Sequence, residues 1–156
     1  MFTGHHYQNA YICDDIQAAI AAFATHADIG NVAPFDVEQQ LWTPSGMKRV
    51  ATRLAFIWIG DLQYELIQVI ADGSGIYANY QDNGGIMHFH HVCTRVPDWD
   101  VFRAAVATQD LPVVLERANE GDHLKFLYLD GRAVCGHYLE YTWMTDEMSL
   151  RLGAPA

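Results

Sequence analysis

Two glutamates lie in the middle of apolar segments that have the composition of β-strands. Glu65 lies in "QYELIQ" and Glu140 in "HYLEYT". A carboxylate among apolar neighbours is costly to bury unless it is paired or bound to a cation. A single such glutamate could equally face solvent on an edge strand. Because the two glutamates occupy the same place in the two halves of the chain, we interpret both as candidate metal ligands or acid–base groups.

Three of the eight histidines lie within the segment "MHFHHV", residues 87–92. Alternate residues of a strand face opposite sides, so His91 is expected on one face with Phe89, and His88 and His90 on the other. His91 occupies the position that Gln8 has in the first half, which makes it the candidate ligand. His88 and His90 are interpreted as ordinary histidines on the other sheet face or at the strand entrance. The same ordinary roles are assigned to His5, His6, His123 and His137.

These residues belong to a repeat. Residues 8–23, "QNAYICDDIQAAIAAF", and residues 91–106, "HVCTRVPDWDVFRAAV", both open with a polar residue that can bind a metal and continue as an apolar strand. Asp15 and Asp98 follow at the same offset, where each can accept hydrogen bonds from a helix start. Apolar residues then recur at a spacing that buries one helical face.

The remainder of each half is predicted to form further strands, with a turn at Gly60 in the first half. Each half is therefore predicted to be β-α-β-β-β, in an α+β fold. The halves are residues 1–75 and 84–156 of a single domain, 1–156, and the segment 71–85 that joins them is rich in Gly, Asp and Asn. A repeat this long favours a pseudo-symmetric fold over a solenoid. The predicted strands are 6–13, 35–41, 53–59, 62–69, 87–96, 112–117, 123–129 and 134–143.

Composition excludes several classes of partner. The 156 residues carry a formal charge of −10 with only nine Lys and Arg, which disfavours binding to nucleic acid. No apolar run is long enough to cross a membrane, and the N-terminus lacks the pattern of a secretion signal. Cys13, Cys93 and Cys135 are far apart, which is typical of a cytoplasmic protein.

The duplicated pattern, the "HHVCTRVPD" strand and the closing "YELIQ" and "YLEYT" strands together resemble the vicinal oxygen chelate superfamily. That superfamily includes glyoxalase I, methylmalonyl-CoA epimerase, bleomycin-resistance proteins and extradiol dioxygenases. "IGDLQYELIQ" and "HHVCTRVPD" are most similar to the epimerase and glyoxalase-like branch. The resemblance implies two βαβββ modules in a pseudo-two-fold arrangement around an open cleft, and a homodimer. It also implies four metal ligands, namely Gln8, Glu65, His91 and Glu140. Gln8 departs from the histidine that epimerases more often have there.

One imidazole, two carboxylates and an amide suit a divalent ion such as Zn, Co, Ni, Mn or Mg. A small substrate could chelate this ion through two neighbouring oxygens, and Glu65 or Glu140 could then move a proton next to its carbonyl group. The expected activity is that of an isomerase, epimerase or lyase. The many aromatic residues favour an apolar or aromatic substrate. Coenzyme A and glutathione conjugates are not favoured, since only Lys48, Arg49 and Arg53 form a cationic cluster.

Three alternatives stay open. The first is a metal-free binding protein of the bleomycin-resistance type, which would hold a ligand in the same cleft. The second is an extradiol-type dioxygenase, which is disfavoured because Gln8 stands where a second histidine is expected for Fe(II). The third is a structural domain that retains a vestigial site.

Overall fold

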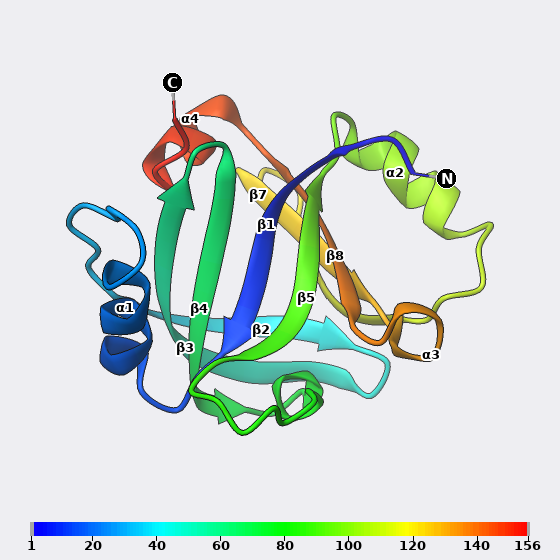
Figure 1. Ribbon diagram of the computed structural model, residues 1–156. Coiled ribbons are helices and arrows are strands. Elements are labelled where there is room, and N and C mark those ends of the chain that lie inside the picture. Colours follow the sequence, from blue (N-terminus) through cyan, green and yellow to red (C-terminus); the bar gives the residue numbers. More distant parts are fainter. Residues whose placement is uncertain (1, 156) are drawn as a thin grey trace.

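A computed structural model describes residues 2–155, in which eight strands curve into one barrel and helices lie on its outside (Figure 1). Each half of the chain has the order β-α-β-β-β, which confirms the predicted α+β fold. Three short helices complete the described chain. The first half consists of β1 (His5–Ile12), α1 (Ile16–Ala24), β2 (Phe35–Thr43), β3 (Gly46–Ile59) and β4 (Leu62–Asp72). The second consists of β5 (His88–Arg95), α2 (Trp99–Val106), β6 (Val113–Arg117), β7 (Leu124–Leu129) and β8 (Tyr138–Met144). The short helices are η1 (Ile76–Ala78), α3 (Arg132–Cys135) and α4 (Asp146–Arg151).

The strands are ordered β1-β4-β3-β2-β6-β7-β8-β5 around the barrel. In each half the first strand runs parallel to the last, β1 beside β4 and β5 beside β8. The halves join along two seams. The first is the long antiparallel pairing of β1 with β5, and the second is a single pair between Trp42 of β2 and Glu116 of β6. The sequence predicted an open cleft between the two halves. In the structure, the pair between Trp42 and Glu116 closes the barrel on the side opposite the β1–β5 pairing.

Both helices start where the aspartates predict. The Asp15 carboxylate accepts hydrogen bonds from the backbone N–H groups of Gln17 (2.9 Å) and Ala18 (3.1 Å). The Asp98 carboxylate accepts one from Val101 N–H (2.9 Å). These bonds satisfy N–H groups that lack partners within the helix. Each helix then packs its apolar face against side chains on the outside of the barrel.

The predicted starts of two strands were wrong. The predicted strand 134–143 begins only at Tyr138, and part of the preceding stretch forms helix α3. Gly136 ends that helix with a φ of +85°, a left-handed conformation that glycine adopts without steric cost. Strand β3 differs in the other direction, since it begins at Gly46 and pairs with β2 through a tight turn.

The segment between the halves contributes to the core. Strand β4 ends at Asp72 and β5 begins at His88, and between them Ile76 and Tyr77 of η1 are buried among the interior side chains. The Asp72 carboxylate fixes this segment by accepting hydrogen bonds from several of its backbone N–H groups. Among residues 2–155, none of the helices combines the length and the apolar character that crossing a bilayer requires.

Candidate metal centre

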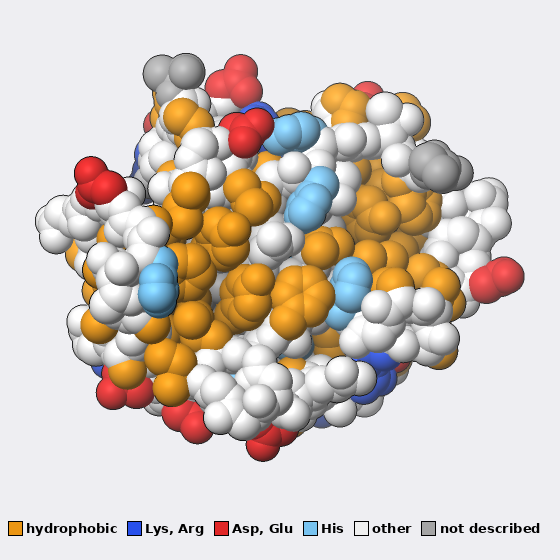
Figure 2. All heavy atoms as spheres, viewed as in Figure 1, with side chains coloured by type: hydrophobic (Ala, Val, Ile, Leu, Met, Phe, Trp, Pro, Cys, Tyr) orange, Lys and Arg blue, Asp and Glu red, His pale blue; other side chains and the backbone are white. Residues whose placement is uncertain are grey.

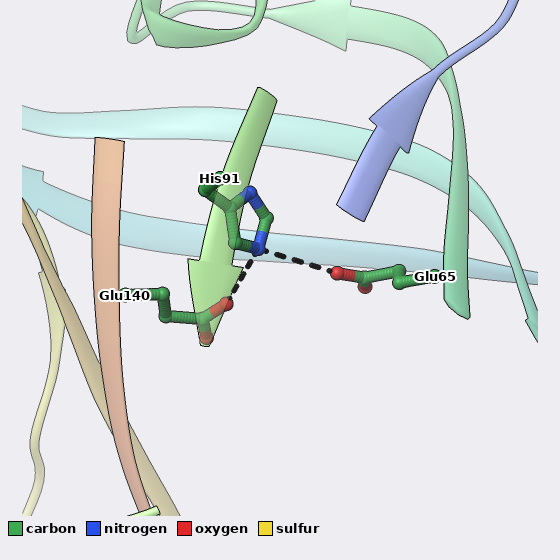
Figure 3. A group of neighbouring side chains, drawn as sticks. All are labelled: Glu65, His91 and Glu140. Atoms are coloured by element: carbon green, nitrogen blue, oxygen red, sulfur yellow. Dashed lines mark ion pairs between the residues drawn. The ribbon is translucent and has the colours of Figure 1, made fainter. Parts of the chain in front are cut away.

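Three of the four predicted ligands converge inside the barrel, each from a different strand (Figure 3). His91 of β5 lies between Glu65 of β4 and Glu140 of β8. Its Nε2 atom is 2.8 Å from Glu140 Oε2 and 3.5 Å from Glu65 Oε2. One ligand atom from each residue lies within 4.8 Å of the other two. All three side chains are almost inaccessible to solvent.

The strand register explains this convergence. In the first half Gln8 pairs with Gln63, two residues before Glu65. In the second half His91 pairs with Tyr138, two residues before Glu140. Gln8 and His91 therefore hold equivalent places in the two halves, as the repeat predicts. Alternation along each strand then points all of these side chains toward the interior.

The fourth candidate, Gln8, lines the same cavity as Glu65 and Glu140. It is 4% exposed, and its Nε2 donates a 2.6 Å hydrogen bond to Gln63 Oε1. Gln63 in turn donates to the backbone carbonyl of Leu152, just beyond α4. This arrangement fixes the Gln8 amide through its nitrogen and leaves Oε1, the atom that binds cations, outside the hydrogen bond. The donor set of one imidazole, two carboxylates and one amide oxygen fits a divalent cation.

The interpretation of His90 was wrong. His90 is 1% exposed and lies inside the barrel, with its ring stacked on Tyr77. A register shift is the cause, because Ala10 pairs with His91 while the next residue, Tyr11, pairs with Phe89. The β-bulge leaves His90 without a partner on β1 and breaks the strict alternation. Phe89, expected beside His91, instead contacts Tyr11 on the outside of the barrel.

His90 fixes the protonation of His91 through a chain of hydrogen bonds. His90 Nε2 is 3.0 Å from the carbonyl oxygen of Ile76, which can only accept, so Nε2 carries the proton. Burial and the neighbouring His91 lower the pKa of His90 to about 3, so its other nitrogen is an acceptor. His91 Nδ1 lies 2.8 Å from that nitrogen and therefore donates to it. The remaining atom, His91 Nε2, faces the two glutamates.

In the absence of a metal, a proton on His91 offsets part of the negative charge of the cluster. Burial lowers the pKa of His91, but its hydrogen bonds to Glu140 and Glu65 outweigh this effect and raise the pKa from 6.5 to about 9. Burial raises the pKa of Glu65, although contact with His91 opposes the change. A protonated His91 thus takes the place of a cation between two carboxylates that would otherwise repel each other.

The cluster borders a cavity of about 260 Å³ inside the barrel. Apolar side chains from β2, β3, β7 and the C-terminal segment form most of its wall, and the phenol groups of Tyr7, Tyr77 and Tyr128 add polar atoms. Burial raises the pKa of all three phenols, so they remain neutral donors at physiological pH. The apolar wall is formed by Phe35, Val37, Val50, Leu54, Phe56, Ile67, Leu124, Phe126, Met144, Met148 and Leu152.

Metal binding is expected to release about one proton per ion at pH 7, because the cation must displace the proton of His91. The pKa of about 9 implies that the metal-free site stays protonated through neutral pH. Apparent affinity should therefore rise about tenfold per pH unit between pH 6.5 and 8.5. In the metal-free protein the same proton stabilises the fold fully below pH 6.5, and this contribution disappears as the pH rises through 9.

Calorimetric titration with Mn²⁺ in two buffers of different ionisation enthalpy measures the number of protons released. A value near zero at pH 7, with an affinity that does not change with pH, would contradict displacement of a proton from His91.

Comparison with known proteins agrees with this architecture. The sequence model of the Glyoxalase/Bleomycin resistance protein/Dioxygenase superfamily matches residues 7–128. The comparison with curated proteins finds no match. A hypothetical protein from Bacillus halodurans C-125 superposes with a TM-score of 0.62 at 12% identity, over 92% of this chain and 96% of its own. Methylmalonyl-CoA epimerase from Mycobacterium tuberculosis superposes with a TM-score of 0.60 at 16% identity, over 96% and 93%.

A third similar structure is a variant of the Streptomyces coelicolor methylmalonyl-CoA epimerase in complex with 2-nitronate-propionyl-CoA. It has a TM-score of 0.60 at 15% identity, over 92% of this chain and 99% of its own. At these identities the structural matches establish the shared fold.

Proposed function

Because this chain belongs to the glyoxalase/bleomycin resistance protein/dioxygenase superfamily, we propose that it is a metal-dependent enzyme. The proposed reaction moves a proton next to a carbonyl group of a small, largely apolar substrate, as an isomerase, epimerase or lyase does. The observation that supports this most strongly is the convergence of Glu65, His91 and Glu140 beside a cavity with apolar walls. The proposed metal ligands are these three residues and Gln8.

The chain's own groups have distinct roles in this proposal. A divalent ion held by the cluster would stabilise the negative charge that develops on a carbonyl oxygen of a chelating substrate. Glu65 or Glu140 accepts the proton from the neighbouring carbon and returns it to the substrate. Burial raises the pKa of Glu65 in the metal-free cluster, and a bound cation would oppose this shift. The apolar wall excludes water from the reacting carbon.

The cavity and the surface charges favour a compact substrate. Arg49 and Arg53, which could have bound the phosphates of coenzyme A, form two-point hydrogen bonds with Glu38 and Asp36. These guanidinium groups are thus already paired with carboxylates on the outside of the barrel. This pairing favours a small acid or ketone over a CoA thioester, although several of the similar epimerase structures contain CoA ligands.

The proposal is tested by proton exchange in D₂O. Protein purified without a nickel column is loaded with one equivalent of Zn²⁺, Co²⁺ or Mn²⁺. It is then incubated with aromatic and branched 2-oxo acids, 2-hydroxy ketones and methylmalonyl-CoA. The expected result is metal-dependent incorporation of deuterium next to the carbonyl of at least one small compound, measured by NMR. Absence of exchange in every arm, despite stoichiometric metal, would contradict the proposed reaction.

A metal-free binding protein is the second candidate, and one observation favours it. Protonated His91 already offsets the charge of one of the two carboxylates, with Nε2 2.8 Å from Glu140 Oε2. The cavity can therefore exist without a cation and hold an apolar ligand. This candidate predicts ligand binding that added EDTA does not change. An extradiol-type dioxygenase has less support, since the cluster offers one histidine and two carboxylates rather than two histidines and one carboxylate.

We also propose that the protein forms a homodimer. Hydrophobic side chains gather over the outer face of β4, β1 and β5 (Figure 2). Aromatic rings contribute to this face, since Tyr11 stacks on Tyr64 and contacts Phe89 edge-on, and all three are only partly buried. A partly buried aromatic face of this kind is typical of an interface between subunits.

A further inference from the structure

We propose that Arg117 binds a carboxylate of the substrate, at the opposite end of the cavity from the metal cluster. The inference rests on the proposed function, since it places the reactive end of the same substrate at Glu65, His91 and Glu140. It narrows the substrate to an organic anion, with an apolar body, adjacent chelating oxygens at one end and a carboxylate at the other.

Arg117 faces the interior of the barrel. It pairs with Phe126 of β7, which pairs with Thr142 of β8, and all three line the cavity. Among the residues that line this cavity in the described part of the chain, it is the single lysine or arginine. The Arg117 side chain is 34% exposed, so solvent screens its charge less than that of a cation in open water and it attracts an anion more strongly.

The sheet register places Arg117 at a useful distance from the cluster. Glu140 pairs with Tyr128, two residues along β7 from Phe126. The backbone of Arg117 is therefore two strands across and two residues along from that of Glu140, about 12 Å away by standard strand spacings. The arginine side chain spans part of this gap. A ligand the length of a substituted benzene ring can reach from one group to the other.

The guanidinium group of Arg117 is only partly occupied. Its Nε forms an ion pair with Asp122 Oδ2 at 3.4 Å, and its Nη1 donates to Gln39 Oε1 at 3.3 Å. Both contacts are long and involve single atoms. The outward-facing Arg53 contrasts with this, since it binds both oxygens of Asp36 at 2.7 and 3.0 Å. A guanidinium group offers five N–H donors in a planar fork that matches a carboxylate, and much of this fork remains available to a ligand.

A structural role is the competing explanation, because Gln39 belongs to β2 and the contact crosses the narrow seam between the halves. Such a role would affect stability but would not distinguish a charged ligand from a neutral one. The test therefore compares two probes that differ only in charge. Both are aromatic hydroxamates, which chelate a divalent ion through two adjacent oxygens. One is 4-carboxybenzohydroxamic acid and the other is its neutral 4-carbamoyl analogue.

Calorimetry with Zn²⁺-loaded wild-type protein is expected to show at least about tenfold tighter binding of the carboxy probe, as charge-assisted hydrogen bonds provide. Arg117→Ala should abolish this preference and leave the affinity for the carbamoyl probe within about threefold of wild type. Arg117→Gln keeps a polar contact for Gln39 and should also lose the preference for the carboxy probe. It replaces the alanine variant in the test if that variant folds poorly. Arg53→Ala removes an equal charge from the outer face and should keep the preference.

A preference that survives in both Arg117 variants would overturn the proposal, and so would equal binding of the two probes by wild type or the absence of measurable binding of either. The same titrations with metal-free protein separate this inference from the proposed function. If probe binding does not depend on metal, the metal centre fails, while the Arg117-dependent difference between the probes still decides the role of Arg117.

Discussion

Replacing His91 with alanine is expected to abolish binding of a divalent ion, together with any metal-dependent turnover. His91 supplies the single imidazole of the cluster, and its Nε2 atom contacts the carboxylates of both glutamates. Without it, two buried carboxylates face each other with no cation between them, and one must become protonated. Glu140→Gln should have a comparable effect, since it removes half of the anionic charge that attracts the ion while keeping the shape of the side chain.

The loss in affinity should exceed the 10–100-fold that is typical of changing a residue behind a metal ligand. Titration with Co²⁺, followed by visible absorption and by calorimetry, measures it. The matched controls are His26→Ala and Glu38→Gln, which alter exposed residues of the same types. If either cluster variant binds Co²⁺ as tightly as these controls, the cluster is not the metal centre.

Replacing His90 with phenylalanine is expected to weaken metal binding about 10–100-fold, although His90 is not itself a proposed ligand. The change keeps a ring that can stack on Tyr77 but removes the nitrogen that accepts the proton of His91 Nδ1. His91 is then free to adopt the other tautomer, in which Nε2 carries the proton and cannot bind a cation. His90 is thus a positioning residue that acts through His91.

Two measurements distinguish this role from a general loss of stability. Nitrogen NMR of the imidazole groups in the metal-free protein above pH 9, where His91 is neutral, should show Nδ1 of His91 protonated in wild type and a mixture of tautomers in the variant. His88→Phe is the matched control. His88 lies two residues away, where it stacks on Tyr80, and changing it should leave the metal affinity intact. An unchanged tautomer in the His90 variant, together with an unchanged metal affinity, would contradict the proposed chain of hydrogen bonds.

The sequence was sufficient for those features that depend on local periodicity. Asp15 and Asp98 marked the helix starts because an N-cap requires a short side chain with an acceptor at a fixed place. Glu65 and Glu140 could be paired because each stands mid-strand at the same point of a repeat. Gln8 and His91 were matched by the same offset, and the register of β1 with β4 and of β5 with β8 agrees with that match.

Features that depend on contacts between distant segments could not be predicted. The β-bulge at His90 follows from how β5 fits against β1, and no residue of "HFHHV" signals it. Assuming strict alternation, the sequence therefore placed His90 on the wrong face. Arg117 was missed because its strand, "VVLER", is short and resembles an exposed edge, whereas closure of the barrel at Trp42 and Glu116 turns its arginine inward.

The proton that His91 holds between the two glutamates also could not be predicted from the sequence. From the sequence, two buried glutamates suggested a bound metal ion as the means of relieving their repulsion. In the structure, His91 lies close enough to both to hold a proton between them. A site that is stable with a proton can form during folding without the ion and bind it afterwards. Because the ion must displace this proton, the proposed metal affinity should depend steeply on pH.

Anomalous X-ray diffraction from crystals soaked in Zn²⁺, collected on both sides of the zinc absorption edge, tests the metal centre most directly. The expected result is one strong anomalous peak bonded to Glu65, His91 Nε2 and Glu140, with Gln8 Oε1 turned toward it. No peak at this cluster at millimolar Zn²⁺, with His91 Nε2 still hydrogen-bonded to Glu140, would contradict the metal centre and favour a metal-free binding cavity.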